Sequence, residues 1–488
     1  MSDKRVSTRL LLKTSFWYTL SNFLTHGMAF ITMPIFTRLM SKVEYGDFSV
    51  YSNWQQILVI ICGIEVNATL NRARFDFQKK EEFDAYITSS LFLTTIVSAV
   101  FLTLYLLFPS FFDRWFLIKR EYMIVMFAYL FTFPAFSMFI VKQRIEYKYK
   151  LSAAISITIT IVSSLAALAL VLNLKFDRIF GRIIGQYSLS IIAGIVFYII
   201  FLCNSRTIKK EYLKYALRIG LPLVFSYLAS RILLTSDTIV LKHMCSAEEV
   251  SYLSVAHSAS QIIMLFVQAL NIAWAPWFYD MLKIKEYSSI KKVYAIYLWA
   301  VTGITLCILL VGPEVIAVLA SEKYREALYL LPPYILSGVF TAFTSPFGYL
   351  ETYYKKPEIS AILTGIVAVL NVALDIIGVR LFGYRAVCYA TVMCQVLLIT
   401  MHYIVTKKLS IGKILPVSTL AGVLFSSIAL IPISLLIYTN KTVRYGTIIL
   451  LTVIVFTMVV INYNRIKLLI NNSLRTKSKA KETNGGQK

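Results

Sequence analysis

Four apolar stretches of the sequence are long enough to cross a membrane, yet each carries polar side chains at helical spacing. Polar groups inside a bilayer are costly, so they normally face protein or a water-filled cavity. For any single residue, a hydrogen bond between two helices is the simpler explanation. Taken together, the four stripes favour a shared polar cavity, which would bind a polar solute. Its candidate lining residues are Asn22, His26, Asn53, Gln56, His257, Gln261, Gln268 and Asn271.

One basic residue, Arg231, falls near the middle of the apolar stretch 218–243. A basic side chain at the bilayer centre costs ~2.5 to 3.5 kcal/mol on insertion scales, so an anionic group should compensate it. Asp237 is a poor direct partner, because six residues of helix place it about 9 Å along the axis and on another face. Two explanations stay open. A carboxylate on another helix, such as Glu65 or Asp375, pairs with Arg231, or the substrate supplies the anion.

A second group of basic residues flanks the same apolar stretches at one of their ends. It comprises Lys13, Arg72, Arg74 and Arg218. Ordinary flanking of membrane helices by snorkelling basic side chains is the simpler explanation for each of them. The functional alternative is an electropositive entrance for a phosphorylated headgroup, because fixed cations can replace the water that a diphosphate loses.

These side chains require a membrane-spanning scaffold, and the composition supports one. Hydrophobic residues make up 58% and charged residues 15% of the 488 residues, which leaves too little polar surface for a soluble globule. A spanning helix needs about 20 mostly apolar residues. The sequence therefore predicts an all-α integral membrane protein with fourteen transmembrane helices, at about 10–38, 46–70, 84–108, 121–141, 151–173, 181–203, 218–243, 250–279, 294–319, 328–352, 358–379, 383–405, 413–438 and 445–463.

Lys and Arg gather in every second connection between the predicted spans. About two thirds of the 49 basic residues lie on the side that holds the N-terminus, which places both termini in the cytoplasm. The net charge of +24 then reflects topology and attraction to anionic membrane lipids. Because the basic residues are spread over many short loops, we do not expect nucleic acid as a partner.

Motifs that would make the chain an enzyme are not found in the sequence. The six cysteines form no CxxC pair and the four histidines are dispersed, so neither a disulfide framework nor a metal site is expected. The P-loop, GxSxG and HExxH patterns are also missing. We therefore expect no catalytic residues, no metal and no cofactor.

An internal repeat defines the predicted domain organisation. Residues 44–57 match residues 249–262 with five identities in fourteen positions, and both copies enter an even-numbered span. An offset of six spans keeps the two halves in the same orientation, so the repeat is parallel. The sequence predicts a six-helix bundle at 1–203, a cytoplasmic linker at 204–217, a second six-helix bundle at 218–405, two further helices within 413–463, and a disordered basic tail at 464–488.

Several short segments carry a resemblance to a known family. The sequence from Pro34 to Gly46, PIFTRLMSKVEYG, is similar to a segment in the first outer loop of Wzx-type polysaccharide flippases of the MOP exporter superfamily. The later segments LPLVFS (221–226), AWAPWF (273–278) and GYRA (383–386) are similar too. The resemblance implies a MATE-like fold with alternating access around a cavity lined by helices 1, 2, 7 and 8.

The same resemblance implies a substrate and a location. The substrate would be an undecaprenyl-diphosphate-linked oligosaccharide, moved from the inner to the outer leaflet of the bacterial cytoplasmic membrane for O-antigen, capsule or other surface polysaccharide. Other polysaccharide assembly proteins would be partners. Because flipping needs a direction, a carboxylate would carry a coupling H⁺ or Na⁺, and the candidates are Asp237, Glu65 and Asp375.

Three other functions stay open at this point. A MATE-type drug antiporter would share the fold, but an acidic cavity would suit cationic drugs better than Arg231 does. A lipid II flippase would be close in chemistry. A membrane-embedded polysaccharide polymerase would be expected to show a long outer loop or an acidic catalytic pair, and the sequence shows neither.

Overall fold

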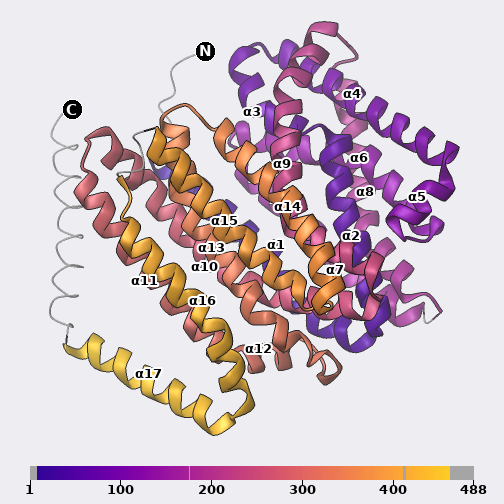
Figure 1. Ribbon diagram of the computed structural model, residues 1–488. Coiled ribbons are helices and arrows are strands. Elements are labelled where there is room, and N and C mark those ends of the chain that lie inside the picture. Colours follow the sequence, from indigo (N-terminus) through magenta and orange to yellow (C-terminus); the bar gives the residue numbers. More distant parts are fainter. Residues whose placement is uncertain (1–7, 175, 410–413, 462–488) are drawn as a thin grey trace.

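The computed structural model describes residues 8–174, 176–409 and 414–461, and every regular element within these ranges is a helix (Figure 1). The N-terminal half holds α1 (Thr8–Leu39), α2 (Lys42–Gly63), α3 (Val66–Asp76), α4 (Lys80–Leu107), α5 (Pro109–Phe116), α6 (Arg120–Ile145), α7 (Tyr149–Asn173) and α8 (Arg178–Asn204). The C-terminal half holds α9 (Lys210–Met244), α10 (Ala247–Lys283), α11 (Tyr287–Leu310), α12 (Gly312–Leu319), α13 (Ala327–Tyr353), α14 (Glu358–Phe382), α15 (Ala386–Lys408), α16 (Val417–Thr439) and α17 (Lys441–Ile461).

The predicted all-α membrane fold is confirmed. Within the described ranges, eleven helices are long and apolar enough to cross a membrane, and residues 27–39 of α1 form a shorter apolar helix. The helices α2 and α17 are not among the eleven. The count of fourteen spans therefore stays a prediction, although helices occupy all fourteen of the predicted stretches.

The second predicted span, at 46–70, is two helices and not one. The chain breaks between α2 and α3 at Ile64 and Glu65, which adopt left-handed φ angles of 47° and 49°. Helix α9 packs closely at this break, because a Cβ atom on Gly220 would lie 2.5 Å from the carbonyl oxygen of Ile64. The sequence is apolar up to the break, so hydropathy did not separate the two helices.

The helices form two bundles that meet along α2, α9 and α10. In the first bundle α6 and α7 pack on α8, and α1 packs on α7. In the second, α10 and α15 pack on α13, and α14 packs on α9 and α15. Helix α2 contacts both α9 and α10, so these three helices build the boundary between the bundles. The predicted linker 204–217 is shorter than expected, because α9 already begins at Lys210.

The parallel repeat is visible in how its two copies begin. Ser41 caps α2 and Ser246 caps α10, and in each case a glutamate three residues later, Glu44 or Glu249, returns a contact to the cap. This reciprocal arrangement satisfies backbone N–H groups that lack a partner in the first turn of a helix. The short helices α5 and α12, each with a proline at its start, are a second matched pair.

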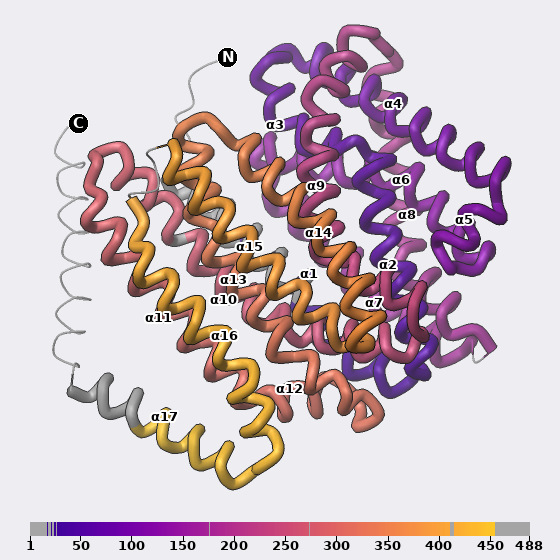
Figure 2. The backbone as a smooth tube through the Cα atoms, in the orientation of Figure 1, coloured from indigo at the N-terminus to yellow at the C-terminus, as the bar shows by residue number. Residues whose placement is uncertain are grey.

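The last two helices lie at the edge of the molecule. Helix α16 packs on α11 and α13, whereas α17 contacts α16 and, more lightly, α11. Figure 2 shows both of them on the side away from the N-terminal half. Both helices therefore pack at the edge of the second bundle. The predicted tail at 464–488 lies outside the described residues.

Candidate functional site between the bundles

The predicted polar residues Asn53 and Gln56 belong to α2, one of the helices at the boundary between the bundles. Asn53 and Gln56 are both half-buried. The amide nitrogen of Gln56 donates a hydrogen bond to the carbonyl oxygen of Ser52 at 3.0 Å. Asn22, His26 and Lys13 belong to α1, and their side chains lie outside the described part of the structure.

Arg231 is half-buried on α9. Within the described residues its guanidinium forms no ion pair or hydrogen bond, and neither Glu65 nor Asp375 pairs with it. Its charge acts on the ring of His257 on α10. Of the two explanations that the sequence left open, a structural carboxylate partner is therefore not observed.

The polar stripe on α10 divides into two parts. His257 and Gln261 lie together, with their side-chain nitrogens 3.1 Å apart, and the His257 ring meets the ring of Tyr334 edge-on at 5.6 Å. Farther along, Asn271 accepts a hydrogen bond from the Tyr297 hydroxyl at 3.1 Å, so it faces α11 of its own bundle. Gln268 is exposed. The structure thus gathers the first part of the stripe near Arg231 and turns Asn271 away from α2.

Two buried carboxylates lie beside each other in the second bundle. Asp237 of α9 is 4% exposed and Asp375 of α14 is fully buried, and they are close enough for their charges to interact. Asp237 accepts hydrogen bonds from the Tyr334 hydroxyl and, at 2.7 Å, from the backbone N–H of Thr238. No basic side chain among the described residues pairs with either carboxylate.

Neutral oxygen-bearing side chains complete this acidic cluster. The Ser236 hydroxyl lies 2.8 Å from the amide oxygen of Asn371 and 3.2 Å from Oδ2 of Asp375. Asn371 in turn donates to the Thr391 hydroxyl of α15 at 3.5 Å. Oδ1 of Asp375 is buried and has no hydrogen-bond partner within the described ranges. Carboxylate, amide and hydroxyl oxygens are what a hard cation or a proton requires.

The sequence named Asp237 and Asp375 as separate candidates but could not bring them together. They are far apart in the chain, and Ser236, Asn371, Thr391 and Tyr334 were not predicted as their neighbours. One signal was available. Asn371 and Asp375 are four residues apart on a helix, so they share a face. The third candidate, Glu65, stands at the break between α2 and α3 and has no side-chain partner in the described part of the chain.

The basic residues at the far ends of α3 and α9 have different roles. Arg74 donates to the carbonyl oxygens of Phe77 at 3.2 Å and Gln78 at 2.8 Å, so it caps the end of α3. Arg72 is exposed and pairs with Asp76 at 3.6 Å. Arg218 is exposed, and no partner for it occurs in the described ranges. Of these three arginines, only Arg218 has no hydrogen bond or ion pair to another described residue.

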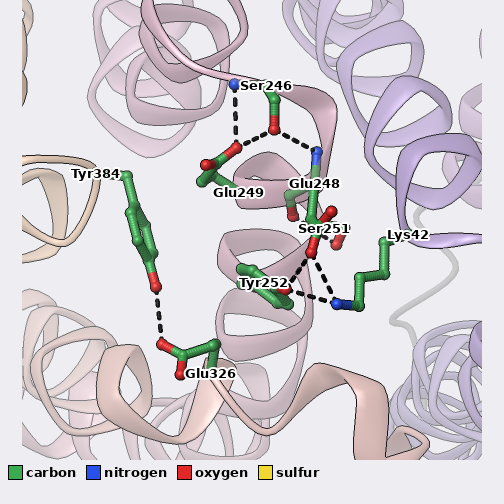
Figure 3. Close-up of polar contacts among 8 residues, drawn as sticks. All are labelled: Lys42, Ser246, Glu248, Glu249, Ser251, Tyr252, Glu326 and Tyr384. Atoms are coloured by element: carbon green, nitrogen blue, oxygen red, sulfur yellow. Dashed lines mark hydrogen bonds and ion pairs between the residues drawn. The ribbon is translucent and has the colours of Figure 1, made fainter.

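At the opposite end of the molecule the two bundles are joined by polar contacts, which the sequence did not predict. We call this the closed end, defined by the α1–α2 turn (39–42) and the α9–α10 turn (244–247). Lys42 of the first bundle donates to Glu248 at 2.7 Å and to the Tyr252 hydroxyl at 2.8 Å, both on α10 (Figure 3).

A second ion pair crosses the closed end in the reverse sense. Lys242 of α9 contacts Asp47 of α2 at 2.5 Å. Nearby, Lys323 donates to the carbonyl oxygen of Met40 at 2.6 Å. A basic residue of each bundle therefore holds an acidic residue of the other, so the two pairs are reciprocal.

The closed end also holds a close approach between the backbones of the two bundles. A Cβ atom on Gly46 of α2 would overlap the carbonyl oxygen of Ala247 at the start of α10. Only glycine permits this approach without a shift of one helix. In the other copy of the repeat the position corresponding to Gly46 is Ser251, so the glycine occurs on one side only.

Comparison with known proteins gives a consistent result. A family described as "Polysaccharide biosynthesis protein" matches residues 11–282, and the MatE family matches residues 222–377. The Lsg locus protein 1 of Haemophilus influenzae is 21% identical over 416 residues, covering 82% of this chain and 99% of that protein.

Two solved structures share the fold at low sequence identity. A lipid II flippase MurJ in an inward closed conformation has a TM-score of 0.66 at 13% identity, covering 91% of this chain and 99% of that one. A multidrug resistance MATE family transporter of the MOP superfamily, in an inward-facing conformation, has a TM-score of 0.59 at 16% identity, covering 80% of this chain and 94% of that one.

Proposed function

Because the chain belongs to the polysaccharide biosynthesis protein family, we propose that it flips an undecaprenyl-diphosphate-linked oligosaccharide across the bacterial cytoplasmic membrane. The family and the fold support a multi-pass membrane transporter of the flippase type. The proposal adds the substrate and the route. The headgroup would pass between the bundles while the lipid tail stays in the bilayer, and rocking of the bundles would open each end in turn.

The observation that carries this proposal is the unpaired guanidinium of Arg231. A half-buried cation without a described carboxylate partner is costly inside a membrane. A diphosphate would compensate it, because phosphate oxygens accept short charge-assisted hydrogen bonds from guanidinium groups. His257 and Gln261 beside it supply hydrogen-bonding groups that suit the sugar hydroxyls next to the diphosphate.

The charge pattern of the loops supports an orientation. The closed end corresponds to connections that carry the fewer basic residues, so we place it at the outer surface. The ends of α3 and α9 that carry Arg72, Arg74 and Arg218 would then face the cytoplasm. Arg218, which is exposed and unpartnered within the described ranges, is the one of these three that would first meet the diphosphate.

We further propose that the acidic cluster couples transport to a cation, either H⁺ or Na⁺. Two buried carboxylates without a basic partner in the described chain, one with a buried oxygen that accepts no hydrogen bond, would be stabilised by either ion. The cluster joins α9 to α14 and α15, and α9 also carries Arg231. A cation bound there would therefore act on the helix that carries the substrate site.

The proposal is tested by reconstituting the full chain in liposomes with a fluorescent undecaprenyl-diphosphate-linked oligosaccharide. An external glycosidase scores how much oligosaccharide has been flipped. We expect Arg231→Ala to abolish protein-dependent flipping, and Ser230→Ala, on the neighbouring position of α9, to retain it. Normal flipping by Arg231→Ala would show that the mid-depth anion site is wrong.

A second candidate substrate, lipid II, is favoured by the similarity of the fold to a lipid II flippase over 91% of the chain. The same liposomes, loaded with fluorescent lipid II, separate the two candidates. Flipping of lipid II in preference to the oligosaccharide would replace the first proposal. Drug efflux without either flipping activity would instead indicate an antiporter.

A further inference from the structure

A groove of about 850 Å³ runs along the boundary between the bundles near the closed end. One wall is α5 of the first bundle, with Phe111 and Trp115. The other wall is formed by the final turns of α9 and α14 in the second bundle. Phe111 and Trp115 are each 56% exposed, so the groove offers a wide apolar surface at the side of the molecule. A membrane protein presents such a surface to lipid.

Two arginines line this groove, Arg114 on α5 and Arg380 on α14. Most basic side chains at the closed end contact a partner, as Lys42 and Lys242 do. Within the described residues at this end, the basic side chains without a hydrogen bond, ion pair or ring contact are Arg114, Arg325, Arg380 and Lys441. Two of these four meet in one groove, from opposite bundles.

Comparison of the two copies of the repeat shows that the groove lies where one half of the molecule lacks a contact that the other half makes. Helix α12, the counterpart of α5, packs on α1, and the Thr37 hydroxyl donates to the carbonyl oxygen of Leu319 at 3.2 Å. Between α5 and α9 no such hydrogen bond occurs in the described chain. The equivalent space is filled by protein beside α12 and left open beside α5.

We propose that this groove binds an anionic phospholipid of the adjoining leaflet. The phosphate would lie between Arg114 and Arg380, whose guanidinium groups have no other described partner and match phosphate oxygens in geometry and charge. One acyl chain would cover Phe111 and Trp115. His243, whose Nδ1 contacts the carbonyl oxygen of Ile239 at 2.9 Å, also lines the groove and leaves Nε2 for the headgroup.

The position of the groove gives the bound lipid a conformational effect. Its walls belong to different bundles, so rocking of the bundles changes its width. A ligand that binds one conformation better shifts the protein toward that conformation. The lipid would bridge α5 to α9 and α14 as Thr37 bridges α1 to α12, and it would favour the closed end.

The experiment uses purified full-length protein and phosphatidylglycerol, with phosphatidylcholine as the neutral comparison. Native mass spectrometry counts retained lipid, and thermal unfolding reports stabilisation as lipid is titrated. The test variant is Arg114→Gln/Arg380→Gln, and the matched control is Arg325→Gln/Lys441→Gln, which removes the same charge from the same end. All four side chains are exposed, so both variants should fold.

We expect the groove variant to need about tenfold more phosphatidylglycerol for half-maximal stabilisation, since bonds from cations to phosphate are among the stronger ones. The control should match the parent protein. Equal responses of the two variants would overturn the proposal, and so would stabilisation by undecaprenyl phosphate in place of phosphatidylglycerol. No transported oligosaccharide is present, so the outcome is independent of the proposed flipping activity.

Discussion

At the scale of single residues, the candidate site separates positive from negative charge. Arg231 of α9 is close enough to His257 of α10 for its charge to act on the His257 ring. Asp237 lies farther along α9, and it is close to Asp375 of α14 inside the second bundle. Because Arg231 does not neutralise either carboxylate, an anionic substrate and a coupling cation would each have a place of their own. One helix, α9, connects these two places.

We predict that Asp375→Asn reduces cation-dependent flipping by at least about tenfold, since loss of even an indirect ligand commonly costs that much affinity. The amide keeps the size of the side chain and removes its charge. Flipping is measured in liposomes with an imposed Na⁺ or H⁺ gradient. As a control, Glu326→Gln changes a carboxylate that accepts a hydrogen bond from Tyr384 (Figure 3) and pairs with Arg385, both within the second bundle. An unchanged gradient response in Asp375→Asn would remove the acidic cluster from the mechanism.

At the scale of elements, the closed end depends on the fit between α2 and α10. We predict that Gly46→Ala destabilises the closed end by about 1 to 3 kcal/mol, because the added methyl group forces the helices apart. A cysteine introduced at the closed end should then react faster with a water-soluble thiol reagent. Gly63→Ala, at a glycine of the same helix with open space around it, should leave the labelling rate unchanged. Equal rates in the two variants would contradict the close fit.

The ion pair between Lys42 and Glu248 makes a smaller contribution. Its side chains are 27% and 45% exposed, and pairs of this kind are worth about 0.2 to 1 kcal/mol. We predict that Lys42→Glu raises thiol labelling at the closed end more than Lys42→Ala does, because it places two like charges together. The double swap Lys42→Glu/Glu248→Lys should restore the original rate. If the swap labels as fast as Lys42→Glu alone, the pair does not hold this end together.

The sequence predicts the long helices better than it predicts the breaks and short helices between them. Hydropathy locates the helices because each is a long apolar run. The break at Ile64 and Glu65 escapes it, because the chain stays apolar up to the break and the backbone angles leave no trace in composition. The short helix α5 was missed because it lies between two predicted spans, and α12 was missed because it was included in the predicted span 294–319. The proline at the start of each helix was a signal.

The site was predictable in its parts but not in its grouping. Polar residues within apolar stretches are conspicuous, so Arg231, Asp237 and Asp375 could each be named. Which of them meet depends on how α9 packs against α10 and α14, and pattern within one helix does not contain that information. The role of Arg74 was not predicted either, because its carbonyl partners lie just beyond the end of α3, and the sequence did not show that a helix ends there.

At the scale of the whole molecule, transport requires the two bundles to separate at the closed end. We predict that Asp47→Cys/Lys242→Cys, in a background without the six native cysteines, loses flipping when treated with a short thiol cross-linker. Each single variant should keep flipping after the same treatment. A cleavable cross-linker should allow activity to return on reduction. Full activity in the cross-linked double variant would contradict movement at this end.

The glycine contact between α2 and α10 also bears on how fast the closed end can separate. Where side chains interlock, helices part only after several rotamers change, and each change adds to the activation barrier. Gly46 lies against the backbone of Ala247 and has no side chain that must change rotamer before the helices separate. Helices α2 and α10 can therefore separate at this point without side-chain rearrangement. We expect the rate of opening to be set by the surrounding ion pairs, so salt in the external medium should accelerate it.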